Sequence, residues 1–214
     1  MASRPVPGTR PMTFEEFLRF DERQRRRHEF VDGFAYALAG ATTGHNLIAG
    51  NIQFALRLAA GGGVCRIYQE GVKLRVRDDV YYPDVMVVGA PGGDDERMAY
   101  APCLLVEVLS PSTARNDRSQ KLNAYRAIAS LQSYLVVSRA ARHVTWHWRD
   151  PAGEWQREEL FGEGEIPLPC PAPGGVLTLD AIYRGIDFPT PPTGRPKRVK
   201  EERVPAGAAP GDAD

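Results

Sequence analysis

One carboxylate lies inside an apolar segment of the chain. Residues 103–109 read C-L-L-V-E-V-L, apolar except for Glu107, and Ser110-Pro111 follow directly. A short apolar run that ends at a turn predicts a strand buried on both faces. An isolated carboxylate there would cost several kcal/mol in desolvation. Glu107 must therefore be protonated, paired with a cation or bound to a metal ion.

A second carboxylate stands at the start of another apolar segment. Asp84 follows Pro83 and precedes the run V-M-V-V at residues 85–88. Because proline cannot join a central ladder, the strand is expected to begin after it. If the two strands are neighbours, Asp84 and Glu107 can share a hard cation such as Mg²⁺, which prefers oxygen ligands.

The helix expected after the 103–109 strand carries a lysine. Asp117, Lys121 and Tyr125 are spaced i, i+4 and i+8, so they lie along one helical face. A lysine beside two metal-binding acids can orient or help to deprotonate a water molecule, while the metal stabilises charge on a phosphoryl oxygen. This combination of residues is typical of phosphodiester hydrolysis.

Each of these residues also has a structural interpretation. Asp117 can cap its helix, and Lys121 can be a surface residue paired with Asp117. Asp84 can be a turn residue and Glu107 a structural buried acid. Tyr125 is better explained by packing than by catalysis.

Taken together, these residues resemble the Uma-two family, a widespread bacterial group of restriction-endonuclease-like proteins in the PD-(D/E)XK nuclease superfamily. The similarity extends over about residues 12–185. It rests on Pro83-Asp84, on the string E-V-L-S-P-S-T that begins at Glu107, on Asp117 and Lys121 ahead of Tyr125, on H-E-F-V-D-G from His28, and on the helix at His45.

The resemblance implies an α/β (α+β) fold with a restriction-endonuclease-like core, in which helices flank a central mixed β-sheet. It implies Mg²⁺ or Mn²⁺ as cofactor, bound by Asp84 and Glu107 with Glu29 as an additional ligand. The wider superfamily has a lysine two residues after the second acid, where this chain has Leu109. That role therefore passes to Lys121, and the expected catalytic residues are Asp84, Glu107 and Lys121.

The function implied by the resemblance is a metal-dependent endodeoxyribonuclease with DNA as substrate. A homodimer is expected too, since paired cuts suit two-fold symmetry. The missing lysine at position 109 and the zero net charge motivate an alternative, a catalytically inactive nuclease-fold module that binds nucleic acid or a protein partner. A metal-dependent hydrolase of a smaller phosphorylated substrate is a third interpretation.

The rest of the sequence predicts the elements that position these residues. Residues 13–16 form a capping-box pattern, and Asp32-Gly33 predicts the turn of a hairpin over 28–36. We expect a lead-in at residues 1–11, one domain at 12–188 and a disordered tail at 189–214. The further expected elements are a helix from residue 43 to the glycines 61–63, strands at 65–68, 72–77 and 85–88, a loop at 89–98, a helix at 117–130, a strand at 133–137, a hairpin of 143–148 with 155–160, and a closing helix or turn at 176–188.

Histidines and arginines outside these motifs are interpreted as structural. His45 falls in the first turn of its helix, where packing or capping is the favoured role. His143 and His147 share one strand face, but no third zinc ligand is near them in sequence. The arginines of residues 21–27 are interpreted as a solvated helix end in preference to a phosphate-facing patch. The cationic stripe within 73–77 is likewise expected to face solvent.

Composition limits the class of protein. The 214 residues are 43% hydrophobic and 25% charged with a net charge of zero, ordinary for a single globular domain. Three unpatterned cysteines, Cys65, Cys103 and Cys170, predict a reduced, cytoplasmic protein without a cysteine-based zinc site. We expect no signal peptide and no association with membranes, since no apolar run approaches spanning length.

Overall fold

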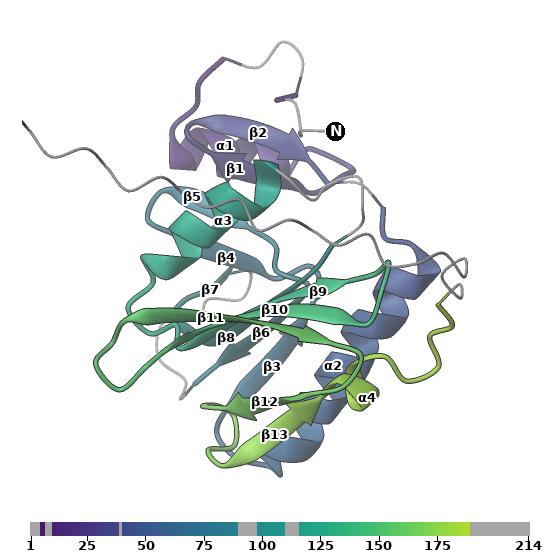
Figure 1. Cartoon of the computed structure of the whole chain (residues 1–214). Coiled ribbons are helices and arrows are strands. Elements are labelled where there is room, and N and C mark those ends of the chain that lie inside the picture. Colours follow the sequence, from purple (N-terminus) through teal and green to yellow (C-terminus); the bar gives the residue numbers. More distant parts are fainter. Residues whose placement is uncertain (1–4, 7–9, 39, 90–97, 110–115, 189–214) are drawn as a thin grey trace, which may run out of the picture.

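A six-stranded mixed sheet forms the centre of the protein in this computed structural model, which describes residues 5–6, 10–38, 40–89, 98–109 and 116–188, without the side chains of 116–119. The strand order is β11-β10-β9-β8-β6-β3 (Figure 1). Only β8 and β9 run parallel among the paired strands of this sheet. Its members are β3 (Arg66–Gln69), β6 (Val85–Val88), β8 (Pro102–Leu109), β9 (Ser133–Ser138), β10 (His143–Arg149) and β11 (Trp155–Phe161).

The central strand β8 is buried along its whole length, as its apolar sequence predicts. Alternate residues of β8 enter two different hydrophobic clusters, because successive side chains of a strand point to opposite faces. Leu104, Val106 and Val108 face one layer, while Leu105 and Leu109 face the other. The sheet is therefore covered on both faces.

Helix α2 (Thr43–Ala60) covers the first face. Thr42 caps its start by accepting a hydrogen bond from the backbone N–H of His45, and Gly61 ends it at φ 54°. Its buried residues Ile48, Ile52 and Leu56 pack in one cluster with β6 and β8. The same layer contains the hairpin of β12 (Glu165–Leu168) and β13 (Gly175–Thr178) and the short helix α4 (Leu179–Ile182), which lie beside α2 (Figure 1).

Helix α3 (Asn116–Arg126) belongs to the second face. Its Tyr125 is fully buried in the cluster that contains Leu105 and Leu109 of β8. The tyrosine ring packs edge-on against Tyr81 and Tyr134, with centroids 5.4 and 5.2 Å away. This packing holds the helix against the face that carries Glu107.

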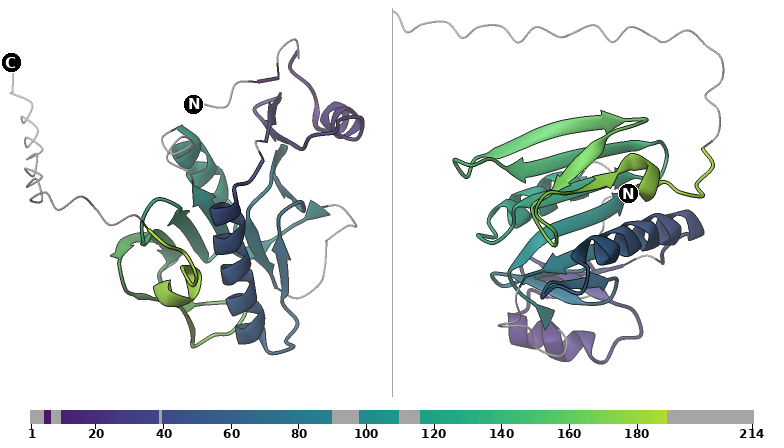
Figure 2. Two further views of the ribbon diagram at one scale, coloured as in Figure 1. Left: turned by 90° about the vertical axis from the view of Figure 1, so that its right-hand side faces the viewer. Right: turned by 90° about the horizontal axis from the view of Figure 1, so that it is seen from below.

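A second, five-stranded sheet has the order β2-β1-β5-β4-β7. Helix α1 (Phe14–Asp21) starts at the predicted capping box of Thr13 and packs Phe17 onto Phe30 at 4.6 Å between ring centroids. The N-terminal elements lie at the opposite end of the molecule from β12, β13 and α4 (Figure 2). The strands are β1 (His28–Val31), β2 (Phe34–Ala37), β4 (Lys73–Val76), β5 (Asp79–Tyr81) and β7 (Met98–Ala99).

The expected Asp-Gly hairpin is present between β1 and β2. Asp32 and Gly33 both have positive φ, 51° and 83°, the conformation that the two central residues of this turn require. The strand expected at 72–77 ends one residue earlier, because β4 stops at Val76, Arg77 takes a positive φ of 57° in the turn and Asp79 begins β5.

Two further elements differ from the expected ones. The helix predicted to reach residue 130 ends at Arg126. Residues 176–188 contain strand β13 before the short helix α4, and the hairpin that β13 forms with β12 was not predicted. Ile166, Leu168 and Leu177 of this hairpin are buried in the same cluster as α2, so its strands are stabilised by tertiary packing.

The expectation of reduced cysteines is wrong for two of the three. Cys103 and Cys170 form a disulfide with their Cα atoms 6.4 Å apart, while Cys65 is free. The two cysteines are 67 positions apart in sequence. Packing of the β12–β13 hairpin into the cluster around β8 brings them together, and the local sequence patterns do not reveal this packing.

The chain ends lie largely outside the described residues. The predicted lead-in at 1–11 is described only at residues 5–6 and 10–11, and the backbone N–H of Val6 donates to the carbonyl of Ala35 at 2.8 Å. Three predicted segments fall outside the described part: the tail at 189–214, most of the loop at 89–98, and the turn at 110–113. Within the described part, no helix is long and apolar enough to cross a membrane.

Candidate active site

Lys121 joins two buried carboxylates that come from different sheets. Its Nζ lies 2.8 Å from Oε1 of Glu29 on β1 and 3.2 Å from both carboxylate oxygens of Glu107 on β8. All three residues are buried, at 5–7% exposure. The interpretation of Lys121 as a surface residue is therefore wrong, and Glu107 has the cationic partner that its burial demands.

Glu107 also accepts a hydrogen bond from the hydroxyl of Tyr125 at 2.7 Å. Burial raises the pKa of Glu107 to about 8, while the positive charge of Lys121 and the tyrosine hydrogen bond act in the opposite direction. Tyr125 therefore contributes packing, as predicted, and also holds one oxygen of the candidate catalytic carboxylate.

Asp84 lies next to Glu107 because β6 and β8 are neighbouring antiparallel strands. Val85 pairs with Val106, and the backbone N–H of Asp84 donates to the carbonyl of Val106 at 3.1 Å. The side-chain Oδ2 of Asp84 accepts from the backbone N–H of Val108 at 2.6 Å. Asp84 thus contacts the residues on both sides of Glu107, and the condition for a shared cation site, that the two strands are neighbours, is met.

Glu29 is held by a backbone contact as well as by Lys121. Its Oε1 accepts from the backbone N–H of Tyr82 at 3.3 Å. Tyr82 stands two positions before Asp84 in the connection between β5 and β6. The carboxylates Glu29, Asp84 and Glu107 therefore gather where the two sheets meet, together with Lys121 from α3.

Two further polar residues contact Asp84, and the sequence analysis did not select either of them for the site. Nε2 of His45 lies 3.1 Å from Oδ2 of Asp84, and Nδ1 of His45 lies 3.7 Å from Oε1 of Glu70. The hydrogen bond with Asp84 is the main cause that raises the pKa of His45. Glu70 lies in no sequence motif that would mark it as a site residue. Antiparallel pairing of β3 with β6 would have identified it, because that register puts the end of β3 beside Asp84.

The donor atoms fit a divalent cation. Among the described residues, one set of three acid or histidine side chains offers donor atoms within 4.8 Å of one another, and it consists of His45, Glu70 and Asp84. Nδ1 of His45 and Oε1 of Glu70 are buried polar atoms without a hydrogen-bond partner in the described structure. Glu29 and Glu107, the other predicted ligands, contact Lys121 beside this set.

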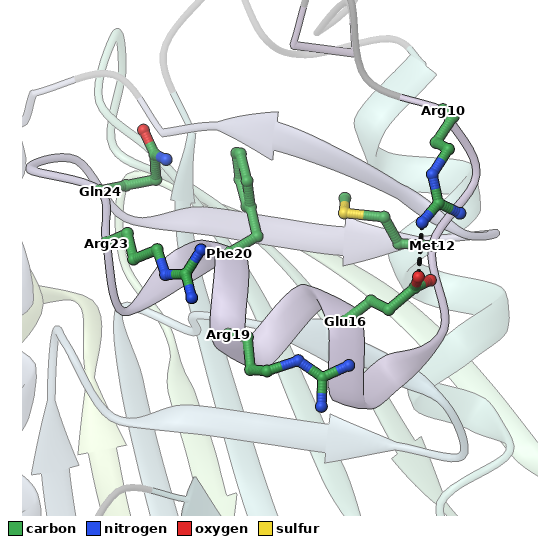
Figure 3. A pocket seen from close by; sticks show the side chains of 7 residues that line it. All are labelled: Arg10, Met12, Glu16, Arg19, Phe20, Arg23 and Gln24. Carbon is green, nitrogen blue, oxygen red and sulfur yellow. Dashed lines mark hydrogen bonds and ion pairs between the residues drawn. The ribbon is translucent and has the colours of Figure 1, made fainter.

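A cavity of about 500 Å³ lies beside helix α1. In Figure 3, Arg19 extends from α1 and Arg23 from the segment that follows it, while Arg10 pairs with Glu16 at 2.6 Å. Within the described part of the chain, Arg19 and Arg23 form no ion pair. The lining residues are Arg10, Met12, Glu16, Arg19, Phe20, Arg23 and Gln24.

The remaining candidate groups serve structural roles. His143 pairs with Glu159 and stacks on Phe161, and His147 stacks on Tyr134, so the geometry gives no support for a zinc site on β10. In the predicted cationic stripe, Lys73 pairs with Asp21 at 3.0 Å, and the guanidinium of Arg75 lies 3.9 Å above the ring of Phe14. Lys73 and Arg75 thus hold α1 against the sheet, so the expectation that the stripe faces solvent is wrong for these two residues.

Comparison with known proteins places this arrangement in a family. The sequence model of the Uma2 family, described as "Putative restriction endonuclease", matches residues 14–181. Two uncharacterized cyanobacterial proteins from Synechocystis sp. are similar in sequence. Protein slr1290 is 33% identical over 87% of this chain and 97% of its own length, and sll1609 is 32% identical over 74% and 92%.

A solved structure shares the fold. It is described as "a putative nuclease belonging to DUF820" from Anabaena variabilis, and it superposes with a TM-score of 0.67 at 16% sequence identity. The match covers 81% of this chain and 98% of the other. The expected α+β fold, a central mixed sheet flanked by helices, is confirmed by this match. On the sequence match to residues 14–181, the chain belongs to the Uma2 family of restriction-endonuclease-like proteins.

Proposed function

We propose that this protein is a Mg²⁺- or Mn²⁺-dependent endonuclease that hydrolyses phosphodiester bonds of DNA. The observation that carries the proposal is the buried Lys121, which lies within 3.2 Å of Glu29 and Glu107 next to Asp84. Three acids and one lysine from separate elements form one centre. Keeping such charges buried is costly unless they serve a function or are fully paired.

In this proposal Asp84 and Glu107 hold the cation and Glu29 assists. The bound cation would supply Lewis-acid stabilisation of charge on a phosphoryl oxygen and lower the pKa of a water molecule. Asp84 is kept in place by the Val108 N–H, and Glu107 by the Tyr125 hydroxyl. The ligand oxygens are therefore positioned by the packed core and not by mobile loops.

Lys121 takes the role that the wider superfamily gives to a strand lysine. Its ammonium group reaches both oxygens of Glu107 from helix α3. From there it can orient a water molecule for attack on phosphorus, and it balances the negative charge of the acids before substrate enters. Leu109, at the usual lysine position, packs in the hydrophobic cluster instead.

The arginine-lined cavity beside α1 supports DNA as the substrate. Arg19 on α1 and Arg23, two residues after the end of α1, line the same cavity and offer two guanidinium groups to a phosphate backbone. Phe20 and Met12 line the same cavity and provide apolar contact area. A local basic surface of this kind can bind DNA although the net charge of the chain is zero.

The alternative is a catalytically inactive module of the same fold that binds nucleic acid or a protein partner. It is favoured by the direct ion pairs of Lys121 with Glu29 and Glu107, which neutralise the site internally. A centre of this kind would be retained for stability. It would need neither Asp84 nor a cation for its function.

Cleavage of supercoiled plasmid DNA separates the two functions. Purified protein is incubated with Mg²⁺, Mn²⁺ or EDTA, alongside Asp84→Ala and Lys121→Ala variants whose folding is verified by circular dichroism. We expect nicking that requires the cation and is lost in both variants. Nicking that survives in Lys121→Ala would remove the lysine assignment, and folded wild-type protein that leaves the plasmid intact would favour the binding module.

A further inference from the structure

Three side chains from different segments converge beside the proposed catalytic acids. His45 lies in the first turn of α2, Glu70 follows β3, and Asp84 precedes β6. One donor atom of each lies within 4.8 Å of the other two. Two opposite ligands of a metal ion with bonds of about 2.1 Å are roughly 4.2 Å apart, so the cluster has nearly the dimensions of a coordination sphere.

Two of these donor atoms are buried and unsatisfied. Among the described residues, Nδ1 of His45 and Oε1 of Glu70 have no hydrogen-bond partner. They face each other at 3.7 Å, which exceeds the length of a hydrogen bond. Buried polar atoms in folded proteins are nearly always paired. The separation suits two ligands that approach the same ion, since neighbouring ligands lie roughly 3 to 4 Å apart at bond lengths of about 2.1 Å.

The backbone holds Glu70 and His45 toward Asp84. Glu70 has φ 38°, an uncommon conformation for a residue with a side chain, and its backbone N–H donates to the carbonyl of Asp84 at 3.1 Å. Gly71 continues the turn at φ 87°. The cap by Thr42 fixes the backbone N–H of His45 at 3.3 Å. The three residues are therefore positioned by a strained turn, a helix cap and a strand start.

We propose that His45 and Glu70, together with Asp84, bind a divalent first-row transition metal and make this site prefer such an ion over Mg²⁺. The inference rests on the proposed function, because Asp84 belongs to both sites, and it adds two ligands and a metal preference. A histidine nitrogen favours transition metals, whereas Mg²⁺ takes oxygen ligands in near-octahedral geometry. The set of one nitrogen and two carboxylates explains the buried unsatisfied atoms.

Metal titration of the full chain by isothermal calorimetry tests this proposal without any substrate. Co²⁺ is the main probe, since its visible absorption also reports a nitrogen ligand, and Mg²⁺ is the comparison. For the wild type we expect Co²⁺ to bind at least tenfold more tightly than Mg²⁺. The His45→Ala variant should lose this preference by weakening Co²⁺ binding at least tenfold, and Glu70→Gln should weaken the binding of both ions.

A matched control comes from the histidine–carboxylate pair on β10 and β11. His143 pairs with Glu159 in a similar way, and His143→Ala should leave Co²⁺ affinity and the absorption spectrum unchanged. Glu70→Gln is nearly isosteric, so it keeps the proposal testable if His45→Ala fails to fold.

The outcomes separate this proposal from the nuclease itself. If Co²⁺ binds the wild type no more tightly than Mg²⁺, the proposal is overturned. It is also overturned if His45→Ala and Glu70→Gln bind Co²⁺ like the wild type while Asp84→Ala does not. In that case His45 is only an ion-pair partner of the acids, and the nuclease centre of Asp84 and Glu107 is still supported.

Discussion

Replacing Glu107 by glutamine should change how the stability of the protein depends on pH. Burial raises the pKa of Glu107 from 4.5 to about 8. Between these values the folded chain holds a proton that the unfolded chain has lost. Because the folded state binds more protons there, the free energy of unfolding falls as the pH rises from about 4.5 to 8. Glu107→Gln removes this titration and should flatten that part of the curve.

The magnitude follows from the shift in pKa. The difference of 3.5 units between 4.5 and 8 corresponds, at about 1.36 kcal/mol per unit, to roughly 5 kcal/mol when the window is fully crossed. Between pH 5 and pH 8 the unfolded carboxyl is already partly ionised and the folded one is half ionised. The loss over this interval is therefore roughly 3 to 4 kcal/mol.

Urea unfolding in EDTA at pH 5, 6.5 and 8 measures this effect, and the informative quantity is the difference between wild type and variant. Two histidines also make the free energy of unfolding depend on pH. Because the pKa of His45 is raised in the folded protein, the free energy of unfolding falls as the pH rises above 6.5. Because the pKa of His147 is lowered to about 4, the free energy of unfolding rises between pH 4 and 6.5. His147 contributes equally to both proteins and cancels in the difference. The charge of Glu107 helps to raise the pKa of His45, so Glu107→Gln also reduces the His45 contribution, and this change flattens the curve in the same direction. Glu165→Gln, which alters an exposed carboxylate on β12, is the control and should follow the wild-type curve. Parallel curves for wild type and Glu107→Gln would refute the reasoning.

Two further predictions concern the lysine and the arginine-lined cavity. Lys121→Met leaves two buried carboxylates without the lysine ammonium group and should lower the free energy of unfolding at pH 8 by about 3–5 kcal/mol. Lys121→Arg, which keeps the positive charge, should lower it by less. An unchanged urea midpoint for Lys121→Met would contradict the ion pairs. The double variant Arg19→Ala/Arg23→Ala should bind duplex DNA with a weaker dependence on salt. The slope of the logarithm of the binding constant against the logarithm of the salt concentration, measured by fluorescence anisotropy, should become smaller in magnitude by about 2, one for each lost phosphate contact. Arg142→Ala, a control near α4, should keep the wild-type slope, and equal slopes in all three proteins would exclude the cavity as a DNA contact.

The sequence was sufficient where local patterns decide the structure. The capping box at Thr13, the Asp-Gly hairpin and the buried strand around Glu107 each follow from short-range rules, and the structure contains all three. The polarity of Glu107 within an apolar strand also predicted that a partner must exist. The family resemblance placed Lys121 in the site as the catalytic lysine, whereas its ion pair with Glu107 is seen only in the structure.

Contacts that depend on the order of strands in the sheet could not be predicted from local sequence patterns. Glu70 joins the site only because β3 pairs antiparallel with β6, which sets Gln69 opposite Val85 and leaves the next residue beside Asp84. Cys103 and Cys170 likewise meet through tertiary packing across 67 positions. His45 was visible in the first turn of its helix, yet its partner Asp84 lies 39 positions later in the chain.

The position of the lysine on a helix follows from the alternation of side chains in β8. Residues two apart on a strand face the same side, so position 109 points toward the same layer as Glu107. Leu109 packs in the cluster that contains Tyr125, four residues after Lys121 on α3. Because α3 covers this layer, a lysine on the helix reaches the same carboxylate that a strand lysine would reach. The ammonium group thus stays next to Glu107 while position 109 becomes available for an apolar contact that fixes the helix.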